Sequence, residues 1–267
     1  MIRNHDKNIS ILGSGWLGHP LAQHLSTTEF NIKISTRSVH RLVELESKNI
    51  LPFIIDIDQL TDTIKSFLDA PILIINITSK NSDGFIKLIA EIEQSSVKKV
   101  IFISSTSVYQ NTNSNVSEAD GAESATSALF HIENLFRDNT HFQTTIVRLA
   151  GLIGYERHPG RFFKNGKKIP QPDAPVNLIH RDDCIGIIET IIQQQAWGET
   201  FNACADSHPT KREFYTYARQ LLGLALPEFL DVEEQQYKII NNMKVKQILK
   251  YSFLHPELMK IDFEGYK

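Results

Sequence analysis

The chain is poor in cysteine, in net charge and in long apolar segments. Its 267 residues include only 2 cysteines, which cannot form a disulfide framework in a chain of this length, so we expect a reducing compartment. Neither Cys184 nor Cys204 lies in a Cys-x-x-Cys or Cys/His cluster, and we therefore expect no metal site. The 28 Lys+Arg against 31 Asp+Glu leave a net charge of −3, which argues against a dedicated nucleic-acid binder.

No apolar segment is long enough to span a bilayer or to act as a secretory signal. The longest, residues 70–77, contains Pro71 and Asn76 and falls far short of the roughly 20 residues that a spanning helix needs. With 41% hydrophobic and 22% charged residues, the chain has enough apolar content to bury a full core. We expect a soluble, cytoplasmic protein.

Short β-branched segments alternate with helical segments over the first 150 residues. The strand segments are continuous apolar runs, which is typical of strands covered on both faces. Strands are expected at residues 9–12, 32–35, 52–55, 72–77, 100–104 and 144–149, and helices at 17–25, 39–46, 60–67, 85–92 and 127–136. This alternation predicts an α/β fold with a doubly wound parallel sheet, the Rossmann architecture.

The alternation ends near residue 150, and residues 151–177 are rich in Gly, Pro, Lys and Arg. A strand is expected at 176–179, followed by a helix at 183–193 whose positive N-terminal end Asp183 would cap. The remaining segments predict a small, mostly helical C-terminal cap on the substrate side, and they are residues 201–203, 211–222 and 245–249.

The first predicted strand leads directly into a glycine-rich loop that opens the first predicted helix. Gly13, Gly15 and Gly18 form the GxGxxG pattern in the strand–loop–helix context that gives it meaning. The first glycine permits a tight turn, the second lets the backbone approach a pyrophosphate, and the third allows close helix packing. A glycine-rich turn without a ligand is the alternative. The predicted cofactor loop is Gly13, Ser14, Gly15, Trp16, Leu17 and Gly18.

This loop determines the expected domain organisation. Residues 1–150 would form a dinucleotide-binding Rossmann domain, with residues 178–196 packing back on it. Residues 151–177 and 197–267 would form a small substrate-side region.

The second predicted strand ends without the carboxylate that commonly bonds the ribose hydroxyls of NAD. Thr36, Arg37 and Ser38 follow it, and no carboxylate occurs before Glu44. A guanidinium at Arg37 could pair with a 2′-phosphate, reinforced by Arg41 one helical turn later. We predict NADP as the cofactor. NAD stays the alternative, in which case the two arginines are solvated charges at a helix start.

Three further segments follow the glycine loop, namely residues 102–109 (FISSTSVY), 147–154 (VRLAGLIG) and 177–183 (NLIHRDD). In their residues and order, the four motifs resemble those of the extended short-chain dehydrogenases/reductases, the NAD-dependent epimerase/dehydratase superfamily. The resemblance covers roughly residues 8–225. It implies a nicotinamide cofactor but identifies no particular reaction.

The resemblance also implies roles for individual side chains. Ser105 takes the place of the family's substrate-polarising hydroxyl, with a loop that satisfies its own backbone as the alternative. Further cofactor contacts are implied for Asp56, Ile57, Asn76, Ile77, Thr78 and Ser104.

The family's catalytic Tyr-x-x-x-Lys dyad is missing. Residues 110–154 contain no tyrosine and residues 100–163 no lysine, so the predicted helix at 127–136 cannot carry the dyad in any register. A positioned proton donor contributes roughly 10²–10⁴ in rate. The chain therefore departs from conventional ketoreductase or epimerase chemistry.

The loop after the strand at 144–149 offers replacements. In the resembled fold it overhangs the nicotinamide, so Tyr155 or His158 could donate a proton, with a plain solvated loop as the alternative. The basic residues that follow this loop could bind an anionic substrate. The alternative is that they form only a charged surface loop. The basic segment, residues 157–168, contains Arg157, Arg161, Lys164, Lys167 and Lys168, and Asn177 and His180 are nearby in the motif order. The substrate candidates are Arg157, Arg161, Asn177 and His180.

Two functions remain open at this point. The first is an NADP-preferring oxidoreductase or epimerase-like enzyme that acts on a small or nucleotide-sugar-like substrate with Ser105 and a non-standard proton donor. The second is a non-catalytic dinucleotide-binding sensor or partner module. In either case we expect a small-molecule ligand, no nucleic acid and no membrane, and a monomer or homodimer.

Overall fold

The computed structural model describes residues 7–163, 166–230 and 232–263. The chain divides into two compact units. Unit 1 comprises Met1–Ser104, Ala125–Val147 and Ile188–Thr200, and unit 2 comprises Ser105–Ser124, Arg148–Ile187 and Phe201–Lys267. Unit 2 therefore includes a segment, Ser105–Ser124, that lies before the boundary expected near residue 150.

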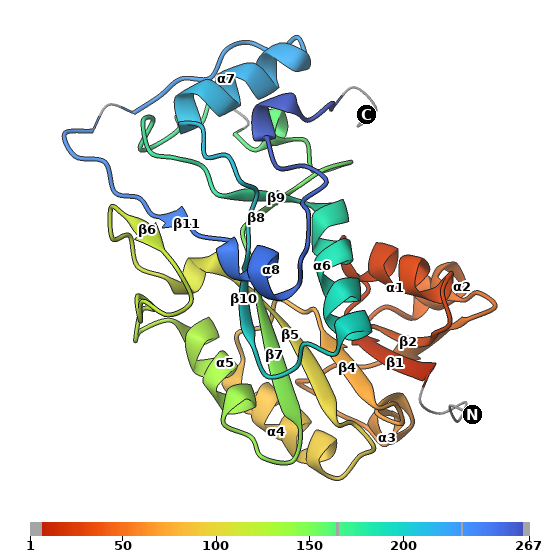
Figure 1. Cartoon of the computed structure of the whole chain (residues 1–267). Coiled ribbons are helices and arrows are strands. Elements are labelled where there is room, and N and C mark those ends of the chain that lie inside the picture. Colours follow the sequence, from red (N-terminus) through yellow and green to blue (C-terminus); the bar gives the residue numbers. More distant parts are fainter. Residues whose placement is uncertain (1–6, 164–165, 231, 264–267) are drawn as a thin grey trace. The chain divides into compact units, whose positions relative to one another are not determined.

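A seven-stranded sheet of order β10-β7-β5-β4-β1-β2-β3 is the central element of the fold (Figure 1). Its strands are β1 (Asn8–Leu12), β2 (Asn31–Thr36), β3 (Ile50–Ile54), β4 (Ile72–Ile75), β5 (Lys99–Ser105), β7 (Gln143–Leu149) and β10 (Thr200–Ala203). β1 is parallel to both β2 and β4, with Ile9 opposite Ile32 and Ile72. The strand order reverses between β1 and β4, and ligands of such sheets bind at the carboxyl ends there. The predicted doubly wound α/β fold is confirmed.

The helices follow the strands as the sequence pattern predicts. They are α1 (Gly18–Ser26), α2 (Leu42–Leu45), α3 (Thr63–Phe67), α4 (Ser82–Glu93), α5 (Ala128–Arg137), α6 (Arg181–Gln194), α7 (Lys211–Leu221) and α8 (Met243–Ile248). The helix expected at 39–46 is divided into a 3₁₀ turn, Val39–Arg41, and α2, because Ser38 makes no side-chain cap and the first turn holds a β-branched residue. None of the described helices is long and apolar enough to cross a membrane.

An aromatic cluster forms the centre of the core in unit 1. Phe136 of α5 is fully buried, and its ring centroid lies 5.1 Å from that of Phe102 on β5 and 5.9 Å from that of Phe85 on α4. Helices α4 and α5 lie side by side (Figure 1). A second helix pair, α1 and α6, is joined by His24 Nε2 and Glu189 Oε2 at 2.9 Å.

Unit 2 has its own apolar core and two small parallel sheets. β6 (Asn115–Val116) pairs with β11 (Ile239–Ile240), and β8 (Gly151–Ile153) pairs with β9 (Leu178–His180). Phe214 of α7 is fully buried in this core.

Two local expectations are wrong. Residues 201–203, expected in a helical cap, belong to strand β10, where each of them is buried. Asp183 does not cap α6, because the helix begins two residues earlier, at Arg181. The Asp183 carboxylate instead accepts the backbone N–H groups of Leu254 at 2.6 Å and His255 at 3.0 Å.

Replacing Phe136 by alanine should lower the free energy of unfolding by about 3–5 kcal/mol, since the ring is fully buried among aromatic neighbours. Urea denaturation followed by circular dichroism measures this loss. The matched control is Phe162→Ala at a side chain that is 39% exposed, which should change stability by no more than about 0.5 kcal/mol. Equal losses in the two variants would contradict the assignment of Phe136 to the core.

Candidate functional site

The glycine loop joins β1 to α1 through positions that have no room for a side chain. Gly13 has a φ of +109°, which favours glycine, and a Cβ there would collide with the carbonyl of Asn76. A Cβ at Gly18 would collide with the carbonyl oxygen of Gly13. The Gly13 N–H donates to Ser35 Oγ at 2.8 Å, which ties the loop to β2. The loop is therefore held tightly between neighbouring strand ends.

Gly15 differs from these two glycines because the space beside it is open. A Cβ at Gly15 would meet no atom of the described chain within 4 Å, so protein packing does not require glycine there. The open space precedes the N-terminus of α1, whose first turn carries no acidic side chain. A pyrophosphate needs such a close, unshielded approach to backbone N–H groups and to the positive end of a helix. These residues fit a dinucleotide.

A cavity of about 500 Å³ in unit 1 opens beside this loop. It brings together the glycine loop, the end of β2 and the segments that follow β3 and β4, as expected at a reversal of strand order. The predicted cofactor residues that line it are Gly13, Ser14, Gly15, Thr36, Arg37, Ser38, Arg41, Asp56, Ile57, Asn76, Ile77 and Thr78.

Four predicted cofactor residues are absent from the lining. Leu17 is buried and Gly18 is the first residue of α1, so both contribute to the packing of the loop and not to the cavity surface. Trp16 is half-buried. Ser104 donates its hydroxyl to Glu133 Oε1 at 2.5 Å in a buried pair, and this bond directs it toward α5.

Two arginines reach the cavity from the end of β2. Arg41 Nη1 donates to the carbonyl oxygen of Ser14 at 2.9 Å, and Arg41 Nη2 lies 3.4 Å from Glu44 Oε1. Arg41 is therefore held against the glycine loop. Arg37, by contrast, is an exposed side chain at the cavity.

Two carboxylates line the same cavity and take part in local hydrogen bonds. Asp56 Oδ1 accepts the N–H of Asp58 at 3.1 Å. Asp58 Oδ1 accepts the side-chain amide of Asn81 at 2.7 Å. Both carboxylates thus anchor the segment after β3.

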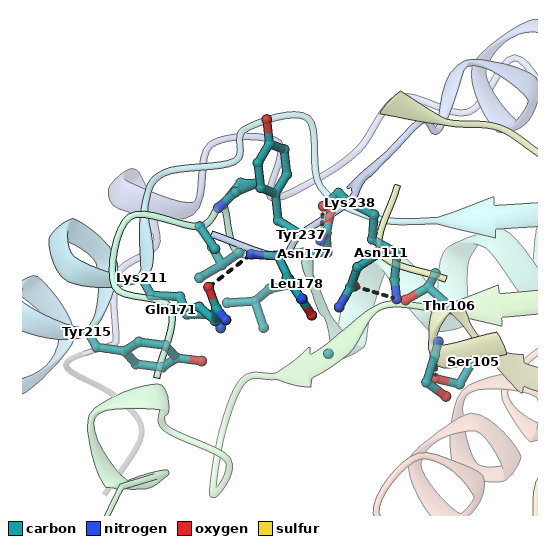
Figure 2. Close-up of a pocket in the computed structure, with 16 residues that line it drawn as sticks. Ser105, Thr106, Asn111, Gln171, Asn177, Leu178, Lys211, Tyr215, Tyr237 and Lys238 are labelled. Atoms are coloured by element: carbon teal, nitrogen blue, oxygen red, sulfur yellow. Dashed lines mark hydrogen bonds between the residues drawn. The ribbon is translucent and has the colours of Figure 1, made fainter. Parts of the chain in front are cut away.

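A second cavity, of about 490 Å³, lies within unit 2 (Figure 2). Ser105 and Asn177, both predicted as site residues, line it. Asn177 also fixes one wall, because its Nδ2 donates to the carbonyl of Lys238 at 2.9 Å and its Oδ1 accepts the Ile240 N–H at 2.9 Å. The sequence did not single out several further lining residues: Gln171, Lys211, Tyr215, Gln236, Tyr237 and Lys238.

Two ammonium groups and a phenol give this cavity its polar character. Lys238 Nζ donates to the Tyr109 carbonyl at 2.8 Å, and Lys211 Nζ donates to the Pro170 carbonyl at 3.1 Å. Burial lowers the pKa of both lysines. Burial also raises the pKa of Tyr215 to about 12, so that this tyrosine is protonated at neutral pH.

Ser105 presents a hydroxyl to the cavity. Its Oγ accepts the N–H of Ser107 at 3.1 Å, and that bond does not use the hydroxyl hydrogen. Ser105 and Tyr215 lie at opposite ends of Figure 2. One ligand can therefore contact both residues only if it is elongated.

Tyr155 and His158, the predicted proton donors, are not among the residues that line this cavity. The Tyr155 hydroxyl donates to Asp182 Oδ1 at 2.9 Å, and burial raises the pKa of this tyrosine. His158 is 1% exposed, its Nδ1 accepts the Gly160 N–H at 3.0 Å, and burial lowers its pKa. The structure thus does not bring either side chain together with Ser105 in this cavity.

Among the predicted substrate residues, Asn177 alone is found in the described lining of the unit 2 cavity. Arg157 and Arg161 are exposed, and Arg161 ends a 3₁₀ helix, Pro159–Arg161. His180 is fully buried, and its Nδ1 accepts the N–H of Asp182 at 3.2 Å. Lys164 lies outside the described residues.

The sequence contains a signal for two of the missed residues. Thr210 and Glu213 form a capping box at the start of α7. Lys211 and Tyr215 are one helical turn apart and share a face of that helix. Lys238 lies in an irregular segment before β11, where no periodicity marks it.

Comparisons with known proteins support a nicotinamide dinucleotide as the cofactor. Residues 13–183 match the family model described as NAD(P)H-binding. The protein YeeZ of Escherichia coli strain K12 is 30% identical over 274 residues, which cover 97% of this chain and 100% of YeeZ.

Two solved structures share the fold. A functionally unknown conserved protein from Silicibacter pomeroyi has a TM-score of 0.80 at 18% identity, over 95% of each chain. UDP-glucuronic acid 4-epimerase from Bacillus cereus, in complex with NAD, has a TM-score of 0.76 at 16% identity, over 97% of this chain and 98% of that chain. These likenesses confirm the fold expected from the epimerase/dehydratase resemblance. With the family model and the full-length relative, they show that this chain belongs to the NAD(P)H-binding family.

Proposed function

We propose that the chain is an NADP(H)-dependent enzyme of oxidoreductase or epimerase type, acting on a small anionic substrate such as a nucleotide sugar. The observation that carries this proposal is the unit 2 cavity, where the Ser105 hydroxyl and two lysines line one space. The family membership of the chain accounts for the cofactor. The lysines supply the attraction for an anionic group.

The end of β2 supports NADP rather than NAD. No carboxylate follows Thr36 before Glu44, and Glu44 pairs with Arg41. The guanidinium of Arg37 is exposed at the cavity and can pair with a 2′-phosphate in bidentate geometry.

A nicotinamide dinucleotide supplies hydride transfer when bound. Toward it, the chain would contribute the open backbone at Gly15 and the positive end of α1. Toward the substrate, the Ser105 hydroxyl would bond the oxygen on the reacting carbon and stabilise its developing charge. Lys211 and Lys238 would orient the anionic part of an elongated substrate.

Helix α5 cannot supply the usual proton. It carries neither tyrosine nor lysine, and its Glu133 is fully buried against Ser104. The loss of a positioned donor costs roughly 10²–10⁴ in rate. We therefore expect slower turnover than in an enzyme with the complete dyad.

The same departure favours a second function, a non-catalytic dinucleotide-binding sensor or partner module. Incubation with NADPH and a panel of carbonyl compounds and nucleotide sugars separates the two. Oxidation of NADPH or a new sugar product supports the enzyme, whereas tight cofactor binding with no turnover across the panel supports the sensor.

Two glycine variants distinguish the cofactor-binding role of the loop from its structural role. Gly15→Ala should keep the stability of the wild type, because the added methyl meets no protein atom, yet it should weaken NADPH binding at least tenfold. Gly18→Ala should lower the thermal midpoint, because its methyl collides with the Gly13 carbonyl. Calorimetric titration and thermal melts give both values. Unchanged NADPH affinity in the Gly15 variant would place the dinucleotide elsewhere.

Removal of the exposed guanidinium should affect one dinucleotide only. Arg37→Ala is expected to raise the Kd of NADPH about 10–100-fold and to leave the Kd of NADH unchanged, because charged hydrogen bonds contribute about 1.5–3 kcal/mol. Arg37→Lys should restore part of the affinity, since lysine keeps the charge without the bidentate geometry. Equal effects on the two dinucleotides would argue for NAD.

Ser105→Ala should lower kcat about 10²–10³-fold for any substrate found in the panel, with little change in the Kd of NADPH. Steady-state kinetics and cofactor titration measure the two effects. Ser107→Ala is the matched control, since this neighbouring serine lines the same cavity and bonds Ser105 through its backbone. If the two variants lose the same activity, Ser105 has no special role.

A further inference from the structure

Outside the two cavities, unit 2 contains a cluster of two histidines and one aspartate. One possible ligand atom from each of His180, Asp182 and His255 lies within 4.8 Å of the others. Asp182 Oδ2 is 3.4 Å from His180 Nδ1 and 3.6 Å from His255 Nε2. The three residues come from the end of β9, the first turn of α6 and the segment after α8.

We propose that His180, Asp182 and His255 bind one divalent transition-metal ion of the zinc class. Nitrogen and oxygen ligands about 2.0–2.2 Å from a tetrahedral ion lie roughly 3.3–3.5 Å from one another. The two measured separations to Asp182 Oδ2 are close to this spacing. Two imidazoles and one carboxylate suit zinc, nickel or iron(II), whereas magnesium and calcium prefer sites built from oxygen alone.

The two carboxylate oxygens of Asp182 have different surroundings. Oδ1 accepts the Tyr155 hydroxyl at 2.9 Å, and Oδ2 faces both histidines. A hydrogen bond to the outer oxygen of a ligating carboxylate is the usual second-shell support of a metal site. Tyr155 therefore has a positioning role at this cluster.

His255 is held in place by a buried carboxylate. Asp183 is 1% exposed, and its oxygens accept the N–H groups of Leu254 and His255 and the hydroxyl of Tyr251 at 3.1 Å. These three bonds fix the segment that supplies His255 against the first turn of α6. The fold thus brings the three side chains together, with the ring centroids of His180 and His255 3.9 Å apart.

The lone pair of His180 Nδ1 and the solvent exposure of the other two side chains also fit an ion. His180 Nδ1 accepts the Asp182 N–H at 3.2 Å, so this nitrogen carries no proton in the neutral ring, and an ion would replace that long bond. The side chains of Asp182 and His255 are 34% and 26% exposed, which gives an ion a path and leaves room for a water ligand. The expectation of no metal site rested on the two cysteines alone, and the sequence does not reveal this cluster because His255 is far from His180 in the chain.

Titration of the chelator-treated full-length chain with Zn²⁺ alone tests the proposal. We expect one equivalent bound by calorimetry, and a tetrahedral visible spectrum when Co²⁺ is used instead. His255→Ala and Asp182→Asn should each weaken Zn²⁺ binding at least tenfold. His131→Ala, at an exposed histidine of α5, is the matched control and should bind like the wild type.

Circular dichroism and thermal melts of each variant without metal distinguish a folding defect from a loss of metal binding. Asp182→Asn preserves the size of the side chain and serves if His255→Ala is unstable. The proposal is overturned if no saturable Zn²⁺ binding occurs, if the folded Asp182 and His255 variants bind like the His131 control, or if Mg²⁺ binds as tightly as Zn²⁺.

Discussion

The close approach of the chain to itself around Gly13 and Gly18 is the constraint on which the candidate cofactor site depends. The Gly13 carbonyl lies where a side chain of Gly18 would be, and the Asn76 carbonyl lies where a side chain of Gly13 would be. Only glycines let the loop lie this close to the end of β4 while α1 starts directly behind it. The cavity beside Gly15 exists because the loop is held in this way.

Unit 2 depends on the hydrogen bonds of polar side chains, whereas the loop of unit 1 depends on glycines, which have no side chain. The Asn177 amide fixes the segment that carries Lys238, and the Asp183 carboxylate fixes the segment that carries His255. Both segments are irregular and depend on single side chains for their placement. Helix α5 lacks the tyrosine and lysine of the dyad, and its Glu133 instead accepts a buried hydrogen bond from Ser104. The helix that performs catalysis in the resembled family here has a packing role.

Sequence pattern predicted the sheet and the cofactor loop, because apolar strands and glycine spacing are local signals. The family resemblance implied cofactor contacts for Asp56 and Asn76. These residues line one cavity with Thr36 because the carboxyl ends of parallel strands meet at one edge. Sequence pattern could not show that Asp183 binds a distant loop or that residues 201–203 extend the sheet, because tertiary contacts decide both. For the same reason it did not single out Lys238 or the histidine cluster. The predicted proton donors Tyr155 and His158 do not line the cavity that contains Ser105, and their role stays a prediction.

We propose that NADP(H) binds in the unit 1 cavity and that Arg37 contacts its 2′-phosphate. Phosphorus NMR of NADP⁺ titrated with the full-length chain tests this most directly, because the 2′-phosphate and the pyrophosphate give separate signals. If NADP(H) binds in this way, both signals shift and saturate at one equivalent. A shift of the pyrophosphate alone, with NAD⁺ bound as tightly as NADP⁺, would contradict the proposal.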